Sequence, residues 1–436
     1  MELWILVILL LIEFLFAFTL SKGDFLNPTV IYSFVFFLAS VDLSMMKSFW
    51  AVQLNDITVI VLCLGVFVFI LSYNFIGIIG KKFNLKSRSQ IVNRKSIEVN
   101  RTFCYILLFI YIVTIILAFR YVIATAKMYG GSGSIGQLIG IYNGLLKGAT
   151  TDDVSYPFYI QILTDLCGLG SYVWGYIIVN NYAVTKKFNK MYVLFLLLGL
   201  IVCLESGSRG DAISVIFCII CISVLILRKS ESAKRITRKF YSIFIVATVG
   251  VIISFQFFGT TMGRDSYIFT PFEYFSIYLG APILNLNTMI NRYGGYNTGY
   301  FNYTFSGLYS SIGGKLGISS LTAFEDPMVH LASNGHRTGN VATTYMAYYY
   351  DAGLFGVVIL SAIMAIIMYK LYADAKKDKT SNVSYKTIIY AYFCFLLARS
   401  FFSNSLFNAI QLSLIKFILI IVLESKYINR IKIKVR

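Results

Sequence analysis

The sequence predicts an all-α integral membrane protein. Of its 436 residues, 58% are hydrophobic and only 13% are charged, about half of the ~25% charged residues usual in soluble domains. The mean hydropathy is +0.73. Several apolar runs reach the ~20 residues that a helix needs to cross a bilayer. We therefore expect about eleven transmembrane helices, near residues 1–20, 28–45, 57–79, 103–124, 158–182, 191–206, 211–227, 241–258, 340–369, 387–403 and 407–424.

The first apolar run, MELWILVILLLIEFLFAFTL, has neither a basic segment before it nor a small-residue cleavage site after it. Both are features of a secretory signal peptide. We expect this run to be retained as the first membrane helix.

The formal charge of +18 raises the question of a nucleic-acid partner, but the distribution of the basic residues argues against it. Of the 38 lysines and arginines, 27 lie in alternate connections between the expected helices. Basic residues collect in short cytoplasmic loops of membrane proteins. The charge therefore predicts an outer N-terminus, a cytoplasmic C-terminus and an attraction to anionic lipid headgroups, not nucleic-acid binding.

The seven cysteines all lie inside expected membrane helices, where they act as small apolar side chains. Cys218 and Cys221 form a C-x-x-C pair, but the helix around them is apolar and contains no histidine. Helix packing is the better interpretation than redox chemistry or zinc binding.

Two of the expected outer loops are long. With them the chain divides into helices one to eight (1–258, including an outer loop at 125–157), a large outer loop (259–337), and helices nine to eleven with a basic cytoplasmic tail (338–436). Loops this long are usually functional. The large loop mixes tyrosine, asparagine, serine and glycine, including Tyr300 and Tyr303. This mixture suits a carbohydrate, and it equally suits an aromatic belt at the membrane interface.

One outer turn reads ESGSRGD and leads into the seventh expected helix, with Ser206 or Ser208 as its N-cap. The free N–H groups at a helix N-terminus form an anion site, and Arg209 adds a planar cationic fork. The alternative is an ordinary cap, with Arg209 reaching the lipid headgroups.

A second turn, NGHRTGN, precedes the ninth expected helix and has the same composition, with Arg337 beside glycines and Thr338 or Asn340 as caps. We interpret it as a second helix start of the same kind. Arg264 lies just past the eighth expected helix. Three arginines at one membrane face fit a multiply charged anion such as a lipid-linked diphosphate.

The only two histidines, His330 and His336, lie close to Arg337. His336 has three candidate roles: a general acid or base, a phosphate contact, or a structural side chain at the interface. Metal binding has little support, because only Glu325 and Asp326 lie near the histidines. We expect neither a metal nor a cofactor.

The ninth expected helix is too long for the membrane. Thirty residues of helix would extend ~45 Å across a hydrocarbon core of ~30 Å. The helix either projects outward or bends near Asp351-Ala-Gly353. Asp351 is a second candidate base, or a hydrogen-bond acceptor for a sugar.

Two segments, SGSRGDAISV and GNVATTYMAYYYDAGLFGVVIL, resemble the bacterial oligosaccharide repeat-unit polymerases, the Wzy or O-antigen polymerase family, which are related to the O-antigen ligases. The more specific pattern in the second segment includes Asn340, Tyr349, Asp351 and Gly353. The order of membrane helices and the large outer loop resemble the family over the whole chain. The sequence motifs themselves cover about 35 residues.

The resemblance implies a metal-independent GT-C-like glycosyltransferase in the bacterial cytoplasmic (inner) membrane. Its donor and acceptor would both be oligosaccharides on undecaprenyl diphosphate, and a chain-length regulator is a further candidate partner. The implied diphosphate contacts are Arg209, Arg264, Arg337 and Ser208; His336 and Asp351 are the candidate catalytic residues; Asn340, Tyr349, Tyr300 and Tyr303 are the candidate glycan contacts.

Two other functions stay open. A flippase or transporter for lipid-linked oligosaccharides would have charges lining a two-sided cavity, whereas the motifs here lie on one face. An O-antigen ligase uses similar chemistry and differs in its acceptor.

Overall fold

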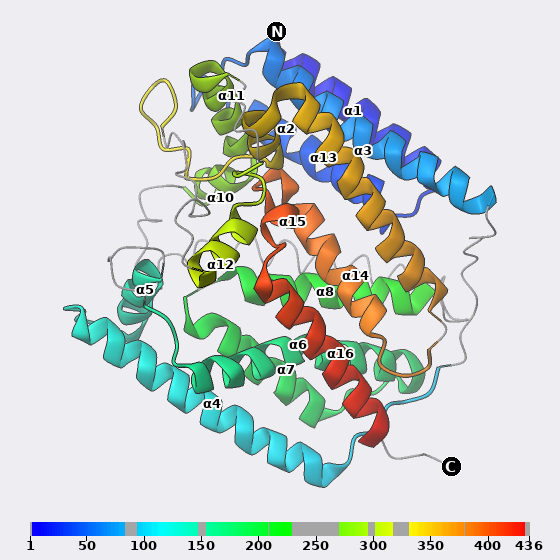
Figure 1. The fold of residues 1–436 in the computed structure, drawn as a ribbon, viewed down its shortest axis with the longest axis vertical. Coiled ribbons are helices and arrows are strands. Elements are labelled where there is room, and N and C mark those ends of the chain that lie inside the picture. The colour runs from blue at the N-terminus through cyan, green and yellow to red at the C-terminus, as the bar shows by residue number, and fades with distance from the viewer. Residues whose placement is uncertain are drawn as a thin grey trace. The chain divides into compact units, whose positions relative to one another are not determined.

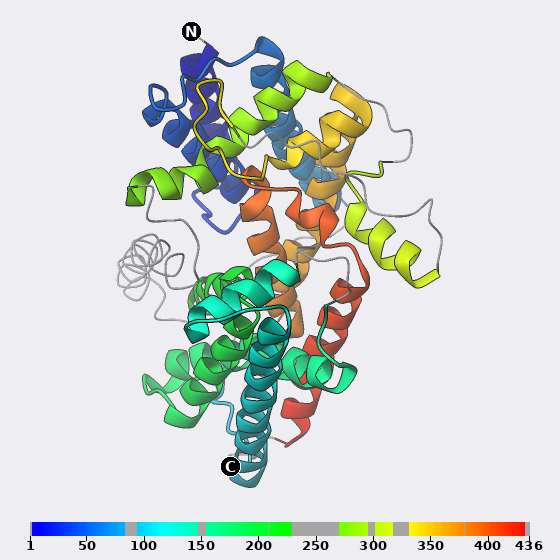
Figure 2. The ribbon, with the colours of Figure 1, turned by 90° about the vertical axis from the view of Figure 1, so that its left-hand side faces the viewer.

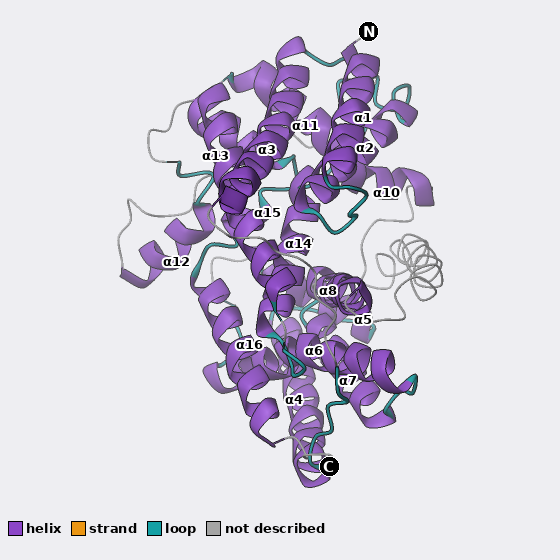
Figure 3. Cartoon of the chain, turned by 90° about the vertical axis from the view of Figure 1, so that its right-hand side faces the viewer, coloured by secondary structure: helices purple, strands orange, loops and turns teal. Residues whose placement is uncertain are grey.

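The computed structural model describes residues 2–82, 94–146, 154–207, 209–228, 270–294, 301–316, 331–378 and 380–431. The regular structure in these ranges is helical, and they contain no strand (Figure 3). The prediction of an all-α chain is confirmed for this part of the protein.

Most of the predicted membrane helices are present with similar bounds. In the described ranges, seven helices are long and apolar enough to cross a bilayer, as expected of an α-helical membrane protein: α1 (Glu2–Leu20), α2 (Pro28–Met45), α3 (Asp56–Lys82), α4 (Arg101–Met128), α6 (Phe158–Thr185), α8 (Arg209–Arg228) and α13 (Thr344–Lys377).

The remaining predicted helices differ more. α7 (Lys190–Glu205) keeps the predicted length, whereas α14 (Tyr385–Ala398) is shorter than predicted and ends in the 3-10 turn η3 (Arg399–Phe401). The eleventh helix was placed wrongly: a short helix, α15 (Ser405–Asn408), comes first, and α16 (Leu412–Ile431) then runs into the predicted basic tail. The predicted helix at 241–258 lies outside the described residues.

The chain forms two compact units. The first consists of residues 1–88, 270–375 and 393–416, and the second of 89–269, 376–392 and 417–436. In the first unit α1, α2 and α3 pack against one another (Figure 1).

The large loop also contributes helices to the first unit. α10 (Pro271–Leu279) and α11 (Ala281–Tyr293) pack on α2, and α12 (Ser306–Leu316) packs on α15. The break between α10 and α11 falls at Gly280, where a Cβ would lie only 2.7 Å from the backbone nitrogen of Leu43. This part of the large loop is therefore a helix pair that contacts α2.

Segments of the first unit that were predicted on the same membrane face contact each other. Asp24, in the loop between α1 and α2, accepts a hydrogen bond from Tyr372 near the end of α13. The second contact lies at the opposite ends of α2 and α13. There Asn334, before α13, donates to the backbone oxygen of Phe49, after α2, at 2.8 Å. Both contacts agree with helices that cross the membrane in alternate directions.

The second unit contains α4, α6, α7 and α8, which pack around α6, and the additional helix α5 (Ile135–Leu145). Ser134 and Gln137 form a capping box at the start of α5, which satisfies two N–H groups that the helix leaves unpaired. α5 lies across the C-terminal end of α4, where Leu138 and Tyr142 pack on Val122 (Figure 2).

Several ionisable side chains lie inside predicted membrane helices, where an unpaired charge is costly. Two examples have hydrogen-bond partners in the structure: Asp42 accepts from the hydroxyl of Ser276 at 2.9 Å, and Asp165 accepts from Gln161 at 2.9 Å. The guanidinium of Arg399 lies over aromatic rings on either side of it in the sequence.

Candidate functional site

The segment NGHRTGN forms a hairpin and not a helix start. Leu331 and Arg337 pair as an antiparallel bridge, and the backbone N–H of Ala332 donates to the oxygen of His336 at 2.8 Å. Gly335 has a φ of +84° at the tip, which an Asn-Gly turn readily adopts. α13 begins only at Thr344. The prediction that Thr338 or Asn340 caps this helix was wrong, because turn chemistry closes the chain before a helix begins.

Contacts with two other segments hold the hairpin and the residues after it. The imidazole of His336 packs on the ring of Phe49, with 4.4 Å between the ring centroids. The amide of Asn285, on α11, donates to the backbone oxygens of Thr338 and Val341 at 3.0 and 2.7 Å. These contacts hold the segment in place, and His336 and Arg337 are exposed.

Asparagines on α11 connect the large loop to the turn before α3. Asn287 donates to the backbone oxygen of Gln53 at 2.9 Å and accepts from the backbone N–H of Asn55 at 2.7 Å and from the hydroxyl of Thr58 at 2.8 Å. The side chain of Asn55 in turn donates to Asn291 at 2.9 Å. This network fixes two segments that are more than 200 residues apart in the sequence.

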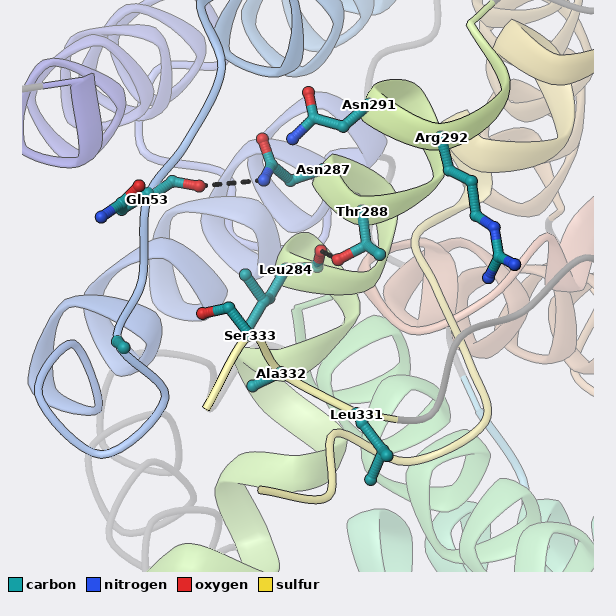
Figure 4. Close-up of a pocket in the computed structure, with 10 residues that line it drawn as sticks. Gln53, Leu284, Asn287, Thr288, Asn291, Arg292, Leu331, Ala332 and Ser333 are labelled. Carbon is teal, nitrogen blue, oxygen red and sulfur yellow. Dashed lines mark hydrogen bonds between the residues drawn. The ribbon is translucent and has the colours of Figure 1, made fainter. Parts of the chain in front are cut away.

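A cavity of about 460 Å³, which we call the α11 pocket, opens beside this network. Figure 4 shows its walls on three segments: the turn before α3, α11 and the hairpin. Its lining consists of Ala51, Gln53, Leu284, Asn287, Thr288, Asn291, Arg292, Leu331, Ala332 and Ser333. Sequence reasoning missed Arg292 and the asparagines as site residues; the i, i+4 spacing of Asn287 and Asn291, which puts both on one helix face, is the signal that could have found the asparagines.

α13 bends at Ala352 and Gly353, where the backbone leaves the helical region and Gly353 has a φ of +59°. Of the two arrangements predicted for this helix, the bend is therefore present. Asp351, immediately before it, is only 1% exposed. Its two carboxylate oxygens accept backbone N–H groups of Tyr303 and Thr304, at 3.2 and 2.6 Å. In this arrangement Asp351 positions the loop that carries Tyr303.

A second cavity, of about 270 Å³, lies beside this loop, and we call it the kink pocket. It brings together Tyr303 and Asn340, which were both predicted as glycan contacts. Tyr349 is buried and does not line it. The full lining is Tyr303, Ser306, Asn340, Val341, Ala342, Thr343, Met346, Ala347, Ser403, Asn404 and Asn408. Asn404 closes the wall by donating to the backbone oxygen of Thr304 at 2.7 Å.

The turn in the second unit differs from the hairpin. α7 ends at Glu205, Gly207 adopts a φ of +73°, and α8 begins at Arg209. The predicted helix start is confirmed here, and Arg209 is only 8% exposed. Ser206 ends α7 instead of capping α8, and its backbone oxygen accepts from Asn143 of α5 at 2.9 Å.

Polar groups without hydrogen-bond partners cluster near this turn. The carboxylate of Glu205 is buried, and among the described residues neither of its oxygens has a partner; the same holds for the hydroxyls of Tyr142 and Tyr156. Burial raises the pKa of the Tyr156 hydroxyl above its usual range, and the nearby Tyr142 and Glu205 raise it further. These groups remain unsatisfied inside the protein, which is costly.

The other predicted site residues, Ser208, Arg264, Tyr300 and His330, lie outside the described residues. Within the described ranges, no three His, Cys, Asp or Glu side chains lie close enough together to hold a metal ion.

Comparison of the chain with models of protein families, with curated proteins and with solved structures gave no match.

Proposed function

We propose that the protein is a membrane glycosyltransferase. It polymerises undecaprenyl-diphosphate-linked oligosaccharide repeat units into a surface polysaccharide, O-antigen or capsule, at the outer face of the bacterial cytoplasmic membrane. The observation that supports this most is the kink pocket, which presents amides, hydroxyls and a tyrosine among apolar helices. Ligand sites have few polar groups at fixed positions in an otherwise apolar wall, and these groups suit sugar hydroxyls and ring faces.

The proposed reaction breaks the bond between the anomeric carbon of the donor glycan and the diphosphate oxygen. A hydroxyl of the acceptor sugar forms the new bond to that carbon and gives its proton to a base, while the lipid diphosphate leaves. Positive groups near the leaving oxygen stabilise the charge that develops on it. Arg337, exposed on the hairpin, is a candidate for this role. Arg209, Arg264 and Ser208 keep the same role as predictions.

Of the two candidate bases, His336 suits proton transfer better. Its imidazole is exposed and contacts Phe49 through the ring face, so that its nitrogens stay accessible. Both oxygens of Asp351 are occupied by backbone N–H groups. We therefore assign proton transfer to His336 and positioning of Tyr303 to Asp351.

The proposal is tested by deleting the gene in its native host and separating the surface glycan on a gel. We expect the deletion to leave single repeat units attached to their acceptor, and the wild-type gene to restore long chains. Loss of a transporter would leave no repeat units at the surface, and loss of a ligase would leave the glycan unattached. Either of these results would replace the proposed function.

The kink pocket is tested by the double variant Asn340→Ala, Asn408→Ala. Both side chains are exposed, and the bond that Asn408 accepts from the hydroxyl of Ser306 at 3.2 Å is exposed as well, so the protein should fold normally. The loss of two hydrogen bonds to the glycan, of ~1 kcal/mol each, should reduce polymerisation ~10-fold or more. Asn74→Ala is the matched control, because Asn74 lies outside the pocket lining and bonds within α3. Normal chain length in the double variant, at normal protein levels, would remove the pocket from the reaction.

A further inference from the structure

The α11 pocket has a chemical bias that the kink pocket lacks. Among the described residues that line it, Arg292 is the single charged side chain. The other polar groups in its wall are amides and hydroxyls. The pocket therefore favours a ligand with one negative charge and several hydroxyls.

Part of the wall is fixed, and part remains available. Asn287 uses its amide nitrogen and its oxygen within the protein. Asn291 uses only its oxygen, which accepts from Asn55. Within the described ranges, the amide nitrogen of Asn291 and the hydroxyl of Ser333 have no protein partner. Fixed polar groups beside available donors lower the entropic cost of binding a ligand.

Arg292 is also available. It lies in the last turn of α11, with its guanidinium over the ring of Tyr293 at 5.5 Å. Among the residues that the structure describes, no carboxylate pairs with it. A guanidinium matches the two oxygens of a carboxylate with two parallel hydrogen bonds, which a lysine would not reproduce.

We infer that the α11 pocket binds an acidic sugar residue of the glycan, with the sugar carboxylate on Arg292 and its hydroxyls on Asn291 and Ser333. The volume of about 460 Å³ lies within the range of small-molecule sites. A lipid diphosphate carries more charge than one arginine balances, so it fits this pocket less well. That the sugar belongs to the repeat unit rests on the proposed function; binding of the sugar does not.

The test measures binding of free glucuronate, glucose and inorganic phosphate to the purified full-length protein by saturation-transfer NMR. We expect glucuronate to bind ~10-fold or more tightly than glucose, since hydrogen bonds between charged groups exceed neutral ones by about that factor. Equal binding of the two sugars would overturn the inference. So would phosphate that binds more tightly than glucuronate, because the pocket would then recognise phosphate and not the sugar.

Two variants and a control assign the preference to the pocket. Arg292→Gln should reduce glucuronate binding to the level of glucose, and Arg292→Lys should restore it in part. Lys47→Gln removes an exposed cation outside the pocket lining and should leave binding unchanged. An unchanged preference for glucuronate in Arg292→Gln would also overturn the inference.

The gel of surface glycan separates this inference from the proposed function. If the gene deletion still makes long chains while Arg292→Gln loses the glucuronate preference, the proposed function fails and the sugar site stands. If the deletion abolishes long chains while wild-type protein binds both sugars equally, the polymerase proposal stands and the acidic-sugar site fails.

Discussion

Two turns of the chain combine glycine, a small polar residue and an arginine: Glu205–Arg209 in the second unit and the hairpin 331–337 in the first. In the turn of the second unit, Arg209 begins α8 and is buried. In the hairpin, Arg337 is exposed and lies seven residues before the start of α13.

The difference comes from what covers each turn. α5 packs over Gly207, where a Cβ would lie 2.9 Å from the Cβ of Asn143. A Cβ on Gly335 would meet nothing within 4 Å. The same residue types thus form a packed corner between two helices in one place and an open tip in the other. Open tips are where binding residues commonly lie, on a fixed scaffold.

The largest expected difference between the turns comes from replacing their glycines with alanine. Gly207→Ala adds backbone strain of ~1–2 kcal/mol at positive φ to an overpacking cost of ~1–3 kcal/mol. Gly335→Ala adds only the strain. We expect the melting temperature in detergent to fall clearly further for Gly207→Ala. Equal losses would mean that α5 does not cover the turn as the structure has it.

The second largest difference in stability should come from replacing the two arginines, Arg209 and Arg337. Arg209→Ala removes a buried side chain and should destabilise the protein by ~1–3 kcal/mol, while Arg209→Met, which keeps an apolar stem in the same place, should recover part of this loss. Arg337→Ala should leave the melting temperature unchanged and shorten the surface glycan. If Arg337→Ala lowered the melting temperature as much as Arg209→Ala does, the expected difference between the two turns would be contradicted.

The smallest effect on stability should come from His336. His336→Phe keeps a ring against Phe49 and removes the imidazole nitrogens, so that stability should change by less than ~0.5 kcal/mol, as for most exposed positions. Under the proposed function, chain polymerisation should nevertheless fall strongly, as measured on the gel. Full activity in this variant would leave His336 with a structural role only and would reopen the question of the base.

The sequence by itself determined most of the long apolar helices in the described ranges. The predicted helix at 28–45 has the same bounds in the structure, because an apolar run of membrane length and its Asn27 cap are local features. For the ninth helix the sequence left two arrangements open, because a helix too long for the bilayer either projects outward or bends at the glycine inside it; the structure has the bend.

The tertiary structure decided where the binding groups meet. The bonds of Asn287 to the turn before α3, and of Asn404 to the loop beside the kink, join segments about 100 to more than 200 residues apart. Hydropathy and spacing carry no information about such pairs, since an asparagine looks the same whether its partner is water or a distant backbone. The composition of NGHRTGN was likewise compatible with a helix start. Its Asn-Gly turn closes a hairpin instead, and the bonds of Asn285 hold the residues that follow against α11.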